Sequence, residues 1–184
     1  MASQDSSGDA FVDSVTWYLE MRRPPAGPAL EPPRPDVRIE PVPSMDVAEY
    51  RELYRAVGEK WGWFDRTWMS DAELSAAIHS SGVEIHVLYV GDARAGYFEL
   101  DFSQLGECQL VYFGLAEGFL GMGLGAYLMD RAARRGFSRG VARLWVHTCD
   151  RDSPRALPAY ERAGFRRYDE KVERVRARAA WPEL

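Results

Sequence analysis

The sequence of 184 residues has no long hydrophobic run. A helix that crosses a membrane needs about 18 or more consecutive apolar residues, and no segment comes near this length. Residues 1–10 are polar and acidic, so they lack the basic start and apolar centre of a secretory signal peptide and the basic character of a transit peptide. We therefore expect a cytoplasmic protein that neither spans nor binds a membrane.

Cysteine and histidine are also scarce. The two cysteines, Cys108 and Cys149, form no C-x-x-C pair, and the three histidines have no close spacing. Structural zinc sites draw on sets of such ligands with characteristic short spacings. We therefore expect two reduced thiols and no bound metal.

Positive charge is in short supply over the first two thirds of the chain. Residues 1–119 carry 9 basic and 20 acidic side chains, a balance of −11, whereas residues 120–184 carry 14 basic and 8 acidic side chains, a balance of +6. Nucleic-acid-binding domains usually present an excess of basic residues, so we expect no nucleic-acid partner. The basic excess near the C-terminus still allows a local site for an anionic ligand.

Apolar residues make up 46% of the chain, which is enough for one folded domain. We expect residues 1–10 to be disordered because they are short of apolar side chains. Residues 11–36 are predicted to hold an extra strand, Phe11–Met21, and then a connector that contains six of the eleven prolines. Residues 37–184 then form a single domain. The extra strand can join the sheet of its own chain or that of a second copy, so a homodimer is possible.

Hydrophobic periodicity predicts a mixed α/β domain. Strands are predicted at 37–42, 83–90, 94–102, 107–115, 143–148 and 166–175, and helices at 46–61, 70–79, 126–135 and 153–162. Three consecutive strands are separated by short turns, so we expect them to be antiparallel. Ser44 or Asp46 is expected to cap the first helix, and Ser70 with Glu73 has the pattern of a capping box. The fold class is therefore α/β with an α+β type of mixed sheet: a mostly antiparallel sheet with about four flanking helices.

Alternating glycines lie between a predicted strand and a predicted helix. This glycine loop, residues 120–126, consists of Leu120, Gly121, Met122, Gly123, Leu124, Gly125 and Ala126. Glycine allows positive φ angles and lets a ligand approach the backbone, and the N–H groups at the start of a helix favour an anion. The loop therefore predicts a phosphate or pyrophosphate site, and a tight turn without a ligand is the alternative.

Two other nucleotide-binding motifs fit this loop less well. A Walker loop ends in Gly-Lys-Ser or Gly-Lys-Thr, which the segment lacks. The dinucleotide pattern G-x-G-x-x-G/A is nominally matched by Gly121, Gly123 and Ala126. The loop nevertheless follows an antiparallel meander, and too few residues remain after it to complete a doubly wound sheet.

A second motif, at residues 156–165, reads ALPAYERAGF. It is close to the pattern Ala-x-x-x-Tyr-x-x-x-Gly-Phe, and the glycine loop is close to the pattern Arg/Gln-x-x-Gly-x-Gly/Ala. In this order and spacing the two motifs resemble those of the GNAT superfamily of acetyl-CoA-dependent N-acetyltransferases, and the likeness covers residues 37–175. The resemblance implies a GNAT-like acyl-CoA N-acyltransferase fold, with its sheet splayed at a cleft for the co-substrate acetyl-CoA.

The resemblance also implies which residues bind acetyl-CoA. They are Phe113, Leu115, Leu120, Gly121, Met122, Gly123, Leu124, Gly125, Ala126, Ser153 and Tyr160. Two positions depart from the family pattern, because Leu120 stands where Arg or Gln is usual and Ser153 stands where Asn is usual. Leucine offers no polar group to a pyrophosphate, whereas serine can still cap a helix.

Two residues are candidates for the chemistry. By resemblance, Tyr160 is the general acid that protonates the departing thiolate, and the alternative is a tyrosine that only packs against Phe165. Glu99 stands on a strand among apolar neighbours, where burial would raise its pKa towards that of a useful base. It is a candidate base and acceptor contact, and the alternatives are a solvated carboxylate or no base at all.

An aromatic cluster follows the first predicted helix and comprises Trp61, Trp63, Phe64 and Trp68. The resemblance places one wall of the acceptor site in this region. Trp61 and Trp63 would hold an apolar stem or a cation there, and Asp65 or Asp71 would pair with an amine. The alternative is a hydrophobic plug beneath a loop.

Taken together, the resemblance implies an enzyme that moves an acetyl group from acetyl-CoA to a primary amine of a small molecule or peptide by direct attack. The charge asymmetry agrees with an anionic donor on one side and a cationic amine on the other. One alternative is a non-catalytic module that binds or senses acyl-CoA. Another is a dinucleotide-binding protein.

Overall fold

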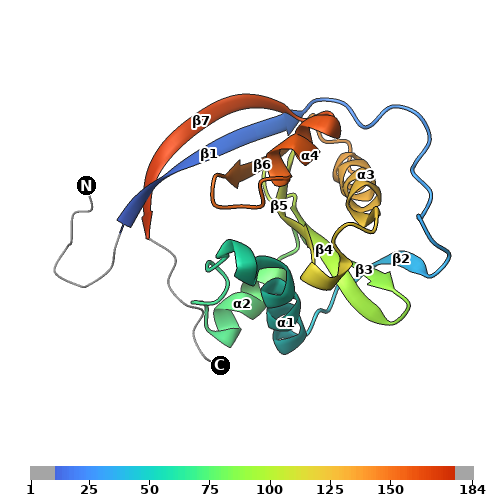
Figure 1. Ribbon diagram of the computed structural model, residues 1–184, viewed down its shortest axis with the longest axis horizontal. Coiled ribbons are helices and arrows are strands. Elements are labelled where there is room, and N and C mark those ends of the chain that lie inside the picture. The colour runs from blue at the N-terminus through green and yellow to red at the C-terminus, as the bar shows by residue number, and fades with distance from the viewer. Residues whose placement is uncertain (1–10, 177–184) are drawn as a thin grey trace.

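Seven strands form one sheet in the computed structural model of the chain, which describes residues 11–176. The strands are β1 (Phe11–Met21), β2 (Val37–Pro41), β3 (Val83–Val90), β4 (Ala93–Asp101), β5 (Glu107–Leu115), β6 (Arg143–Cys149) and β7 (Arg166–Arg176). Their order is β2-β3-β4-β5-β6-β1-β7, and every neighbouring pair is antiparallel except β5 and β6. The predicted mixed, mostly antiparallel sheet is confirmed (Figure 1). The disorder predicted for residues 1–10 lies outside the described residues.

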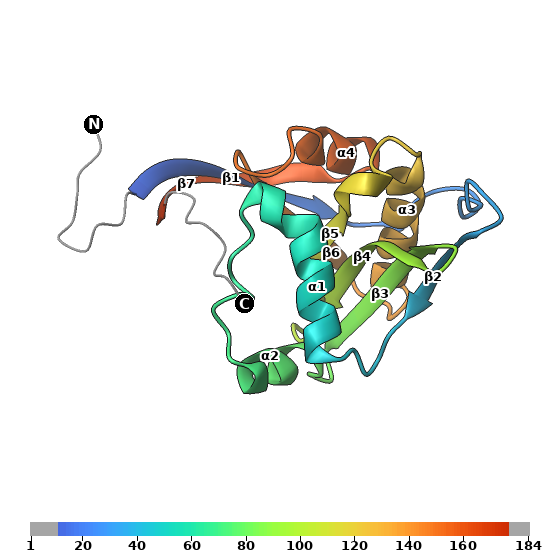
Figure 2. The ribbon, with the colours of Figure 1, turned by 60° about the horizontal axis from the view of Figure 1, so that its bottom comes forward.

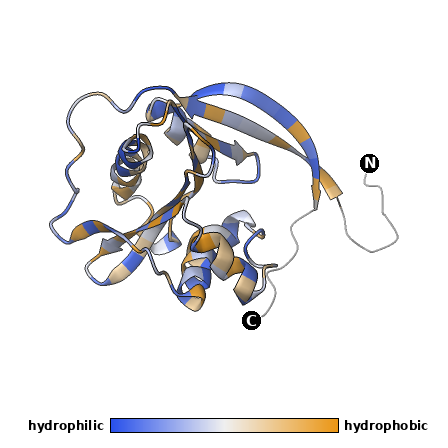
Figure 3. Cartoon of the chain, turned by 180° about the vertical axis from the view of Figure 1, so that it is seen from behind, coloured by the Kyte–Doolittle hydropathy of each residue, from blue (hydrophilic) through white to orange (hydrophobic). Residues whose placement is uncertain are grey.

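Helices cover both faces of this sheet, and they are α1 (Val47–Gly58), α2 (Asp71–Ile78), α3 (Leu124–Phe137) and α4 (Ala156–Arg162). Side chains alternate between the two faces along a strand. Val87 therefore belongs to the core shared with α1 and α2, whereas its neighbour Leu88 belongs to the core shared with α3 and α4. Figure 2 shows α1 and α3 on opposite sides of the strands, and Figure 3 shows hydrophobic residues recurring along the central strands. Among the described residues, no helix is long and apolar enough to cross a membrane.

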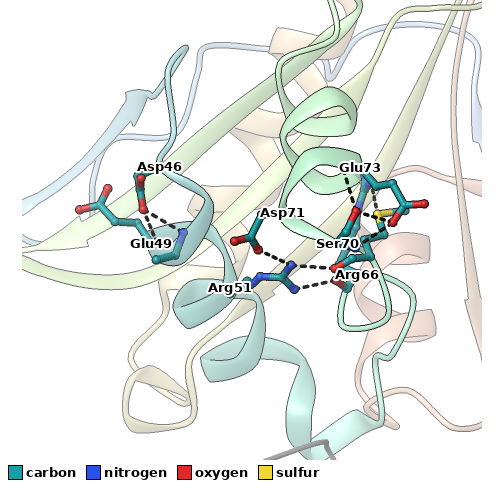
Figure 4. Close-up of polar contacts among 9 residues, drawn as sticks. Asp46, Glu49, Arg51, Arg66, Ser70, Asp71 and Glu73 are labelled. Carbon is teal, nitrogen blue, oxygen red and sulfur yellow. Dashed lines mark hydrogen bonds and ion pairs between the residues drawn. The ribbon is translucent and has the colours of Figure 1, made fainter. Parts of the chain in front are cut away.

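Side-chain caps set the starts of α1 and α2. The Asp46 carboxylate accepts hydrogen bonds from the backbone N–H groups of Ala48 and Glu49. Ser70 and Glu73 form the predicted capping box, in which each side chain accepts the backbone N–H of the other residue (Figure 4). These local contacts explain why the two helices begin where the sequence predicts.

α4 begins at Ala156, three residues later than predicted. The Ser153 hydroxyl accepts the backbone N–H of Arg155 at 3.3 Å, and the Ser153 carbonyl accepts the N–H of Ala156 at 2.8 Å. These bonds close a turn around Pro154 ahead of the helix. Ser153 therefore does not cap α4, whose N-cap is Arg155, because its hydroxyl serves the preceding turn.

β1 lies between β6 and β7 and pairs with both strands. Residues Thr16–Met21 pair with β6, and Phe11–Glu20 pair with β7. The extra strand therefore joins the sheet of its own chain, and a homodimer stays a prediction. Beyond the end of β6, β1 and β7 continue side by side as a long ribbon (Figure 1).

β5 and β6 run together over only three residue pairs, from Glu107–Arg143 to Gln109–Trp145. Beyond Gln109 the two strands diverge, so residues 110–115 of β5 pair with β4 on one side and with no described strand on the other. The sheet is splayed here, as the resemblance implies. The opening lies at the carboxyl ends of two parallel strands, which is where α/β sheets bind ligands.

Candidate active site

Two cavities meet where β5 and β6 diverge. The smaller cavity, of about 190 Å³, lies against the glycine loop and α4, and we name it the glycine-side cavity. The larger cavity, of about 370 Å³, lies against residues 61–68, which we name the aromatic loop, and we name it the aromatic cavity. Five residues line both cavities, namely Trp61, Trp63, Phe113, Asp152 and Tyr160. Ligands in the two cavities would therefore meet at these five side chains.

The glycine loop turns the chain from β5 into α3. Gly121 and Gly123 have φ angles of +81° and +76°, in the left-handed region that favours glycine. Gly123 is the N-cap of α3. Because glycine has no side chain, the N-cap residue accepts no side-chain hydrogen bond from the N–H groups of the first turn. A Cβ at either glycine would meet no atom of the described residues within 4 Å, which leaves open space before the backbone. The loop thereby fits an anion such as a pyrophosphate.

The predicted acetyl-CoA residues divide into two groups. One group lines the glycine-side cavity and comprises Phe113, Leu115, Leu120, Gly125, Ser153 and Tyr160. The other group lies in the loop or the first turn of α3 without lining that cavity, and comprises Gly121, Met122, Gly123, Leu124 and Ala126. Leu124, for example, has a fully buried side chain, so it can offer a ligand only its backbone. Contacts of both groups with the cofactor stay predictions.

Tyr160 of α4 lies at the junction of the cavities and is only 6% exposed. Its ring packs against those of Phe165 and Phe113, with centroids 5.8 and 6.1 Å apart. Burial raises the pKa of the Tyr160 phenol, and the charge of Asp152 raises it further. The phenol therefore keeps its proton at neutral pH, as a general acid requires. Tyr160 thus packs against Phe165 and also lines the cleft, and its catalytic role stays a prediction.

Asp152 is a cleft residue that the sequence reasoning missed. Its Oδ1 accepts the indole N–H of Trp63 at 3.2 Å, and its Oδ2 accepts the Thr148 hydroxyl at 2.7 Å and the Cys149 backbone N–H at 3.1 Å. Asp152 follows the carboxyl end of β6, which is a usual place for ligand contacts in an open sheet. The position of Asp152 directly after this strand is the feature of the sequence that points to a ligand contact.

The aromatic loop forms one wall of the aromatic cavity through Trp61, Trp63, Phe64, Asp65 and Trp68. Trp63 lies close against the end of α1, because a Cβ at Gly58 would overlap its ring. Tyr112 of β5 packs beside Trp63, with ring centroids 5.3 Å apart. Trp68 is 62% exposed, so the wall combines a packed base with an open rim.

Arg51 of α1 ties down the far end of this loop. Its guanidinium donates to the backbone carbonyls of Arg66 at 3.2 Å and Met69 at 2.7 Å, and it pairs with Asp71 at 2.9 Å (Figure 4). Asp71 therefore faces Arg51 at the start of α2. Asp65, in contrast, lines the aromatic cavity and remains a possible partner of an amine.

Glu99 lies beneath the aromatic loop and lines neither cavity. Its side chain is fully buried, with Oε1 accepting from Arg66 at 2.7 Å and Oε2 accepting from the Tyr50 hydroxyl at 2.7 Å. Burial raises the pKa of Glu99, although the charge of Arg66 opposes the rise. The carboxylate is neither solvated nor exposed to the cleft, because its face of β4 is covered by α1. A role as base stays a prediction that requires Arg66 to move away.

Comparison with known proteins extends these observations. The sequence model of the Acetyltransferase (GNAT) family matches residues 48–165. A search of curated proteins finds no significant match. Among solved structures, a GCN5-related N-acetyltransferase from Sphaerobacter thermophilus aligns with a TM-score of 0.66 and 21% identity, over 91% of this chain and 53% of that chain. The present chain thus spans about half the length of that protein.

Two shorter proteins align over less of this chain. An aminoglycoside acetyltransferase from an uncultured soil metagenomic sample, in complex with sisomicin, has a TM-score of 0.59 and 13% identity over 70% of this chain and 88% of its own. A Bacillus subtilis acetyltransferase in complex with CoA has a TM-score of 0.54 and 19% identity over 71% of this chain and 76% of its own. These likenesses show the fold, and the family model covers well over half of the sequence. The chain belongs to the GNAT family of acetyltransferases.

Proposed function

We propose that the protein transfers an acetyl group from acetyl-CoA to a cationic primary amine by direct attack. The observation that carries this proposal is the position of Tyr160, which lines both cavities of the cleft. An acyl thioester entering from the glycine side and an amine entering from the aromatic side would meet beside its phenol. The family membership agrees with acyl transfer.

The glycine-side cavity is the proposed acetyl-CoA site. N–H groups of residues 121–126 would hold the pyrophosphate. Within residues 11–176, residues 113–115 of β5 have no strand partner on the β6 side, so their backbone is free to pair with the pantetheine arm. Leu120 and Ser153 line the same cavity. The structural neighbour from Bacillus subtilis holds CoA, which supports this assignment.

The aromatic cavity is the proposed acceptor site. Trp61 and Trp63 would contact the acceptor, and Tyr160 would give its proton to the departing sulfur as the new C–N bond replaces the C–S bond. Glu99 would act on the acceptor indirectly, since its ion pair with Arg66 holds the aromatic loop in place.

A ligand screen followed by an activity assay tests the proposal. Acetyl-CoA should raise the melting temperature because it binds the folded state alone, and thiol release should then depend on an added amine. Stabilisation by acetyl-CoA without amine-dependent release would support a non-catalytic acyl-CoA-binding module instead. Stabilisation by NAD in place of acetyl-CoA would support a dinucleotide-binding protein.

A further inference from the structure

We propose that Asp152 anchors the ammonium group of the acceptor at the junction of the two cavities and takes its proton, and that the acceptor is a monoamine carried on an aromatic body. This inference rests on the proposed function and assigns the acceptor side of the same cleft. It names Asp152, rather than the buried Glu99, as the carboxylate that meets the amine.

Position is the first argument for Asp152. Among the five side chains that line both cavities, it is the only one with a charge, since the others are Trp61, Trp63, Phe113 and Tyr160. In the proposed arrangement, an amine in the aromatic cavity meets the thioester at this junction. A carboxylate there attracts the ammonium group to the place where its nitrogen has to react.

The hydrogen bonds of Asp152 are the second argument. Three neutral donors hold the carboxylate in one orientation, namely the Trp63 indole, the Thr148 hydroxyl and the Cys149 backbone N–H. An ionised carboxylate offers about four acceptor sites, so it can still accept from an ammonium group. The Asp152 carboxylate is therefore held in one orientation and keeps acceptor capacity for a ligand. The Glu99 carboxylate, in contrast, is buried in an ion pair with Arg66.

The neighbouring acid completes the chemistry. Asp152 takes one proton from the ammonium group and passes it to water, which leaves a neutral amine able to attack the acetyl carbon. As the C–N bond forms and the C–S bond breaks, Tyr160 gives its proton to the sulfur. The nitrogen loses its second proton in the same step, and this proton returns to the Tyr160 phenol through water. One ammonium and one thioester thus yield one amide, one thiol and one proton.

The lining of the aromatic cavity indicates the body of the acceptor. Its walls carry the rings of Trp61, Trp63, Phe64, Trp68, Tyr112 and Phe113. Aromatic rings bind a flat apolar group by stacking and edge contacts, and they also favour a nearby cation. Asp65 and Arg151 line the same cavity, and their opposite formal charges leave the single negative charge of Asp152 to be matched by the ligand. A single amine attached to an aromatic ring fits this combination.

The test compares Asp152→Asn with Asp150→Asn. Asp150 is exposed, accepts from the Ser14 hydroxyl at 2.6 Å and lines neither cavity, so it is a matched control for the same substitution. With acetyl-CoA and phenethylamine or tyramine, Asp152→Asn should lower kcat/KM by about 100-fold or more, and Asp150→Asn should leave it near the wild-type value. Both variants should keep the melting-temperature rise caused by acetyl-CoA, which shows that the fold and the donor side are intact.

The pH profile separates proton transfer from a merely structural role. An alkylammonium group has a pKa of about 10.4, so a free primary amine is largely deprotonated near pH 11, and the deficit of Asp152→Asn should shrink there. A deficit that stays constant with pH would contradict the proton-accepting role. The wild type should prefer phenethylamine to putrescine and spermidine, and the reverse preference would overturn the proposed acceptor class.

A binding measurement decides the question even without turnover. Phenethylamine added to the CoA-saturated protein should quench tryptophan fluorescence, because the Trp63 indole is hydrogen-bonded to Asp152. Asp152→Asn should weaken the binding of phenethylamine about 10-fold or more. Equal binding by Asp152→Asn and wild type, or none by wild type, would overturn the inference. Absence of amine-dependent thiol release together with intact amine binding would instead count against the proposed transferase function.

Discussion

Arg66 Nη2 donates to Glu99 Oε1 at 2.7 Å, and this ion pair joins the aromatic loop to the buried centre of the sheet. Arg66 also lies over the ring of Tyr112, with its guanidinium carbon 5.4 Å from the ring centroid. The loop that lines the acceptor side is therefore anchored to β4 and β5 by one side chain. The stability of the fold and the shape of the aromatic cavity are coupled at this point.

Arg66→Met should lower the free energy of unfolding by about 3–5 kcal/mol, because it leaves Glu99 buried without its cationic partner. The pKa of Glu99 is already raised by burial and should rise further in the variant. A folded-state pKa above the unfolded value gives stability that is present at low pH and lost as pH rises through the folded pKa. The loss measured by urea unfolding should therefore be larger at pH 8 than at pH 4.

The double variant Arg66→Met with Glu99→Gln is the control for this effect. Glutamine keeps an acceptor for Tyr50 and carries no charge, so the double variant should regain most of the lost stability at pH 8. If the free energy of unfolding of Arg66→Met stays within about 1 kcal/mol of the wild-type value at both pH values, the ion pair does not support the loop.

Gly58→Ala should displace Trp63, because a Cβ at this position would overlap the indole ring. We expect a loss of about 1–3 kcal/mol in unfolding free energy from overpacking and a higher KM for the acceptor, with unchanged acetyl-CoA binding. Gly118→Ala is the matched control, since in the part of the chain that the structure describes a Cβ there meets no atom within 4 Å. Equal acceptor KM values in the two variants would argue against Trp63 as part of the acceptor wall.

Gly123→Ala should weaken acetyl-CoA binding. The φ angle of +76° at this position costs a residue with a Cβ about 1–2 kcal/mol, so the loop should relax and its N–H groups should turn away from the ligand. The rise in melting temperature at a given acetyl-CoA concentration should shrink relative to wild type and Gly118→Ala. An unchanged rise would mean that the loop backbone does not contact the cofactor.

Tyr160→Phe should lower kcat by about 100-fold or more, because the raised pKa of the phenol keeps its proton available for the leaving sulfur. The dissociation constant of acetyl-CoA should change little, since phenylalanine keeps the packing against Phe113 and Phe165. Steady-state kinetics and calorimetric titration measure the two quantities. Wild-type turnover in the variant would reduce Tyr160 to a packing residue.

Glu84 should contribute to stability in a pH-dependent way. Burial raises its pKa, but hydrogen bonds led by that from Arg135 outweigh the effect and lower the pKa to about 2. A lowered folded-state pKa gives stability that is present above the unfolded value and lost as pH falls through the folded value. Glu84→Gln should therefore cost about 1 kcal/mol at pH 7, and the difference from wild type should fade between pH 4.5 and pH 2 in thermal melts.

Much of the fold and part of the site follow from local sequence. The Ser70–Glu73 capping box and the three-stranded meander are confirmed, because both depend on residues close together in the chain. Contacts between distant segments were harder to predict. The sequence allows Glu99 to be a cleft base or a solvated carboxylate, whereas the structure buries it against Arg66 and Tyr50. No local pattern predicts that Asp152 lines the cleft.

By itself, the sequence determined the glycine loop, the helix caps and the strand periods, since backbone freedom, capping and alternation act over a few residues. Only the tertiary structure decided that β1 inserts between β6 and β7, that Arg66 rather than solvent meets Glu99, and that Asp152 stands beside Trp63 and Tyr160. These relationships join segments far apart in the chain, and burial together with the divergence of β5 from β6 determines which polar groups meet.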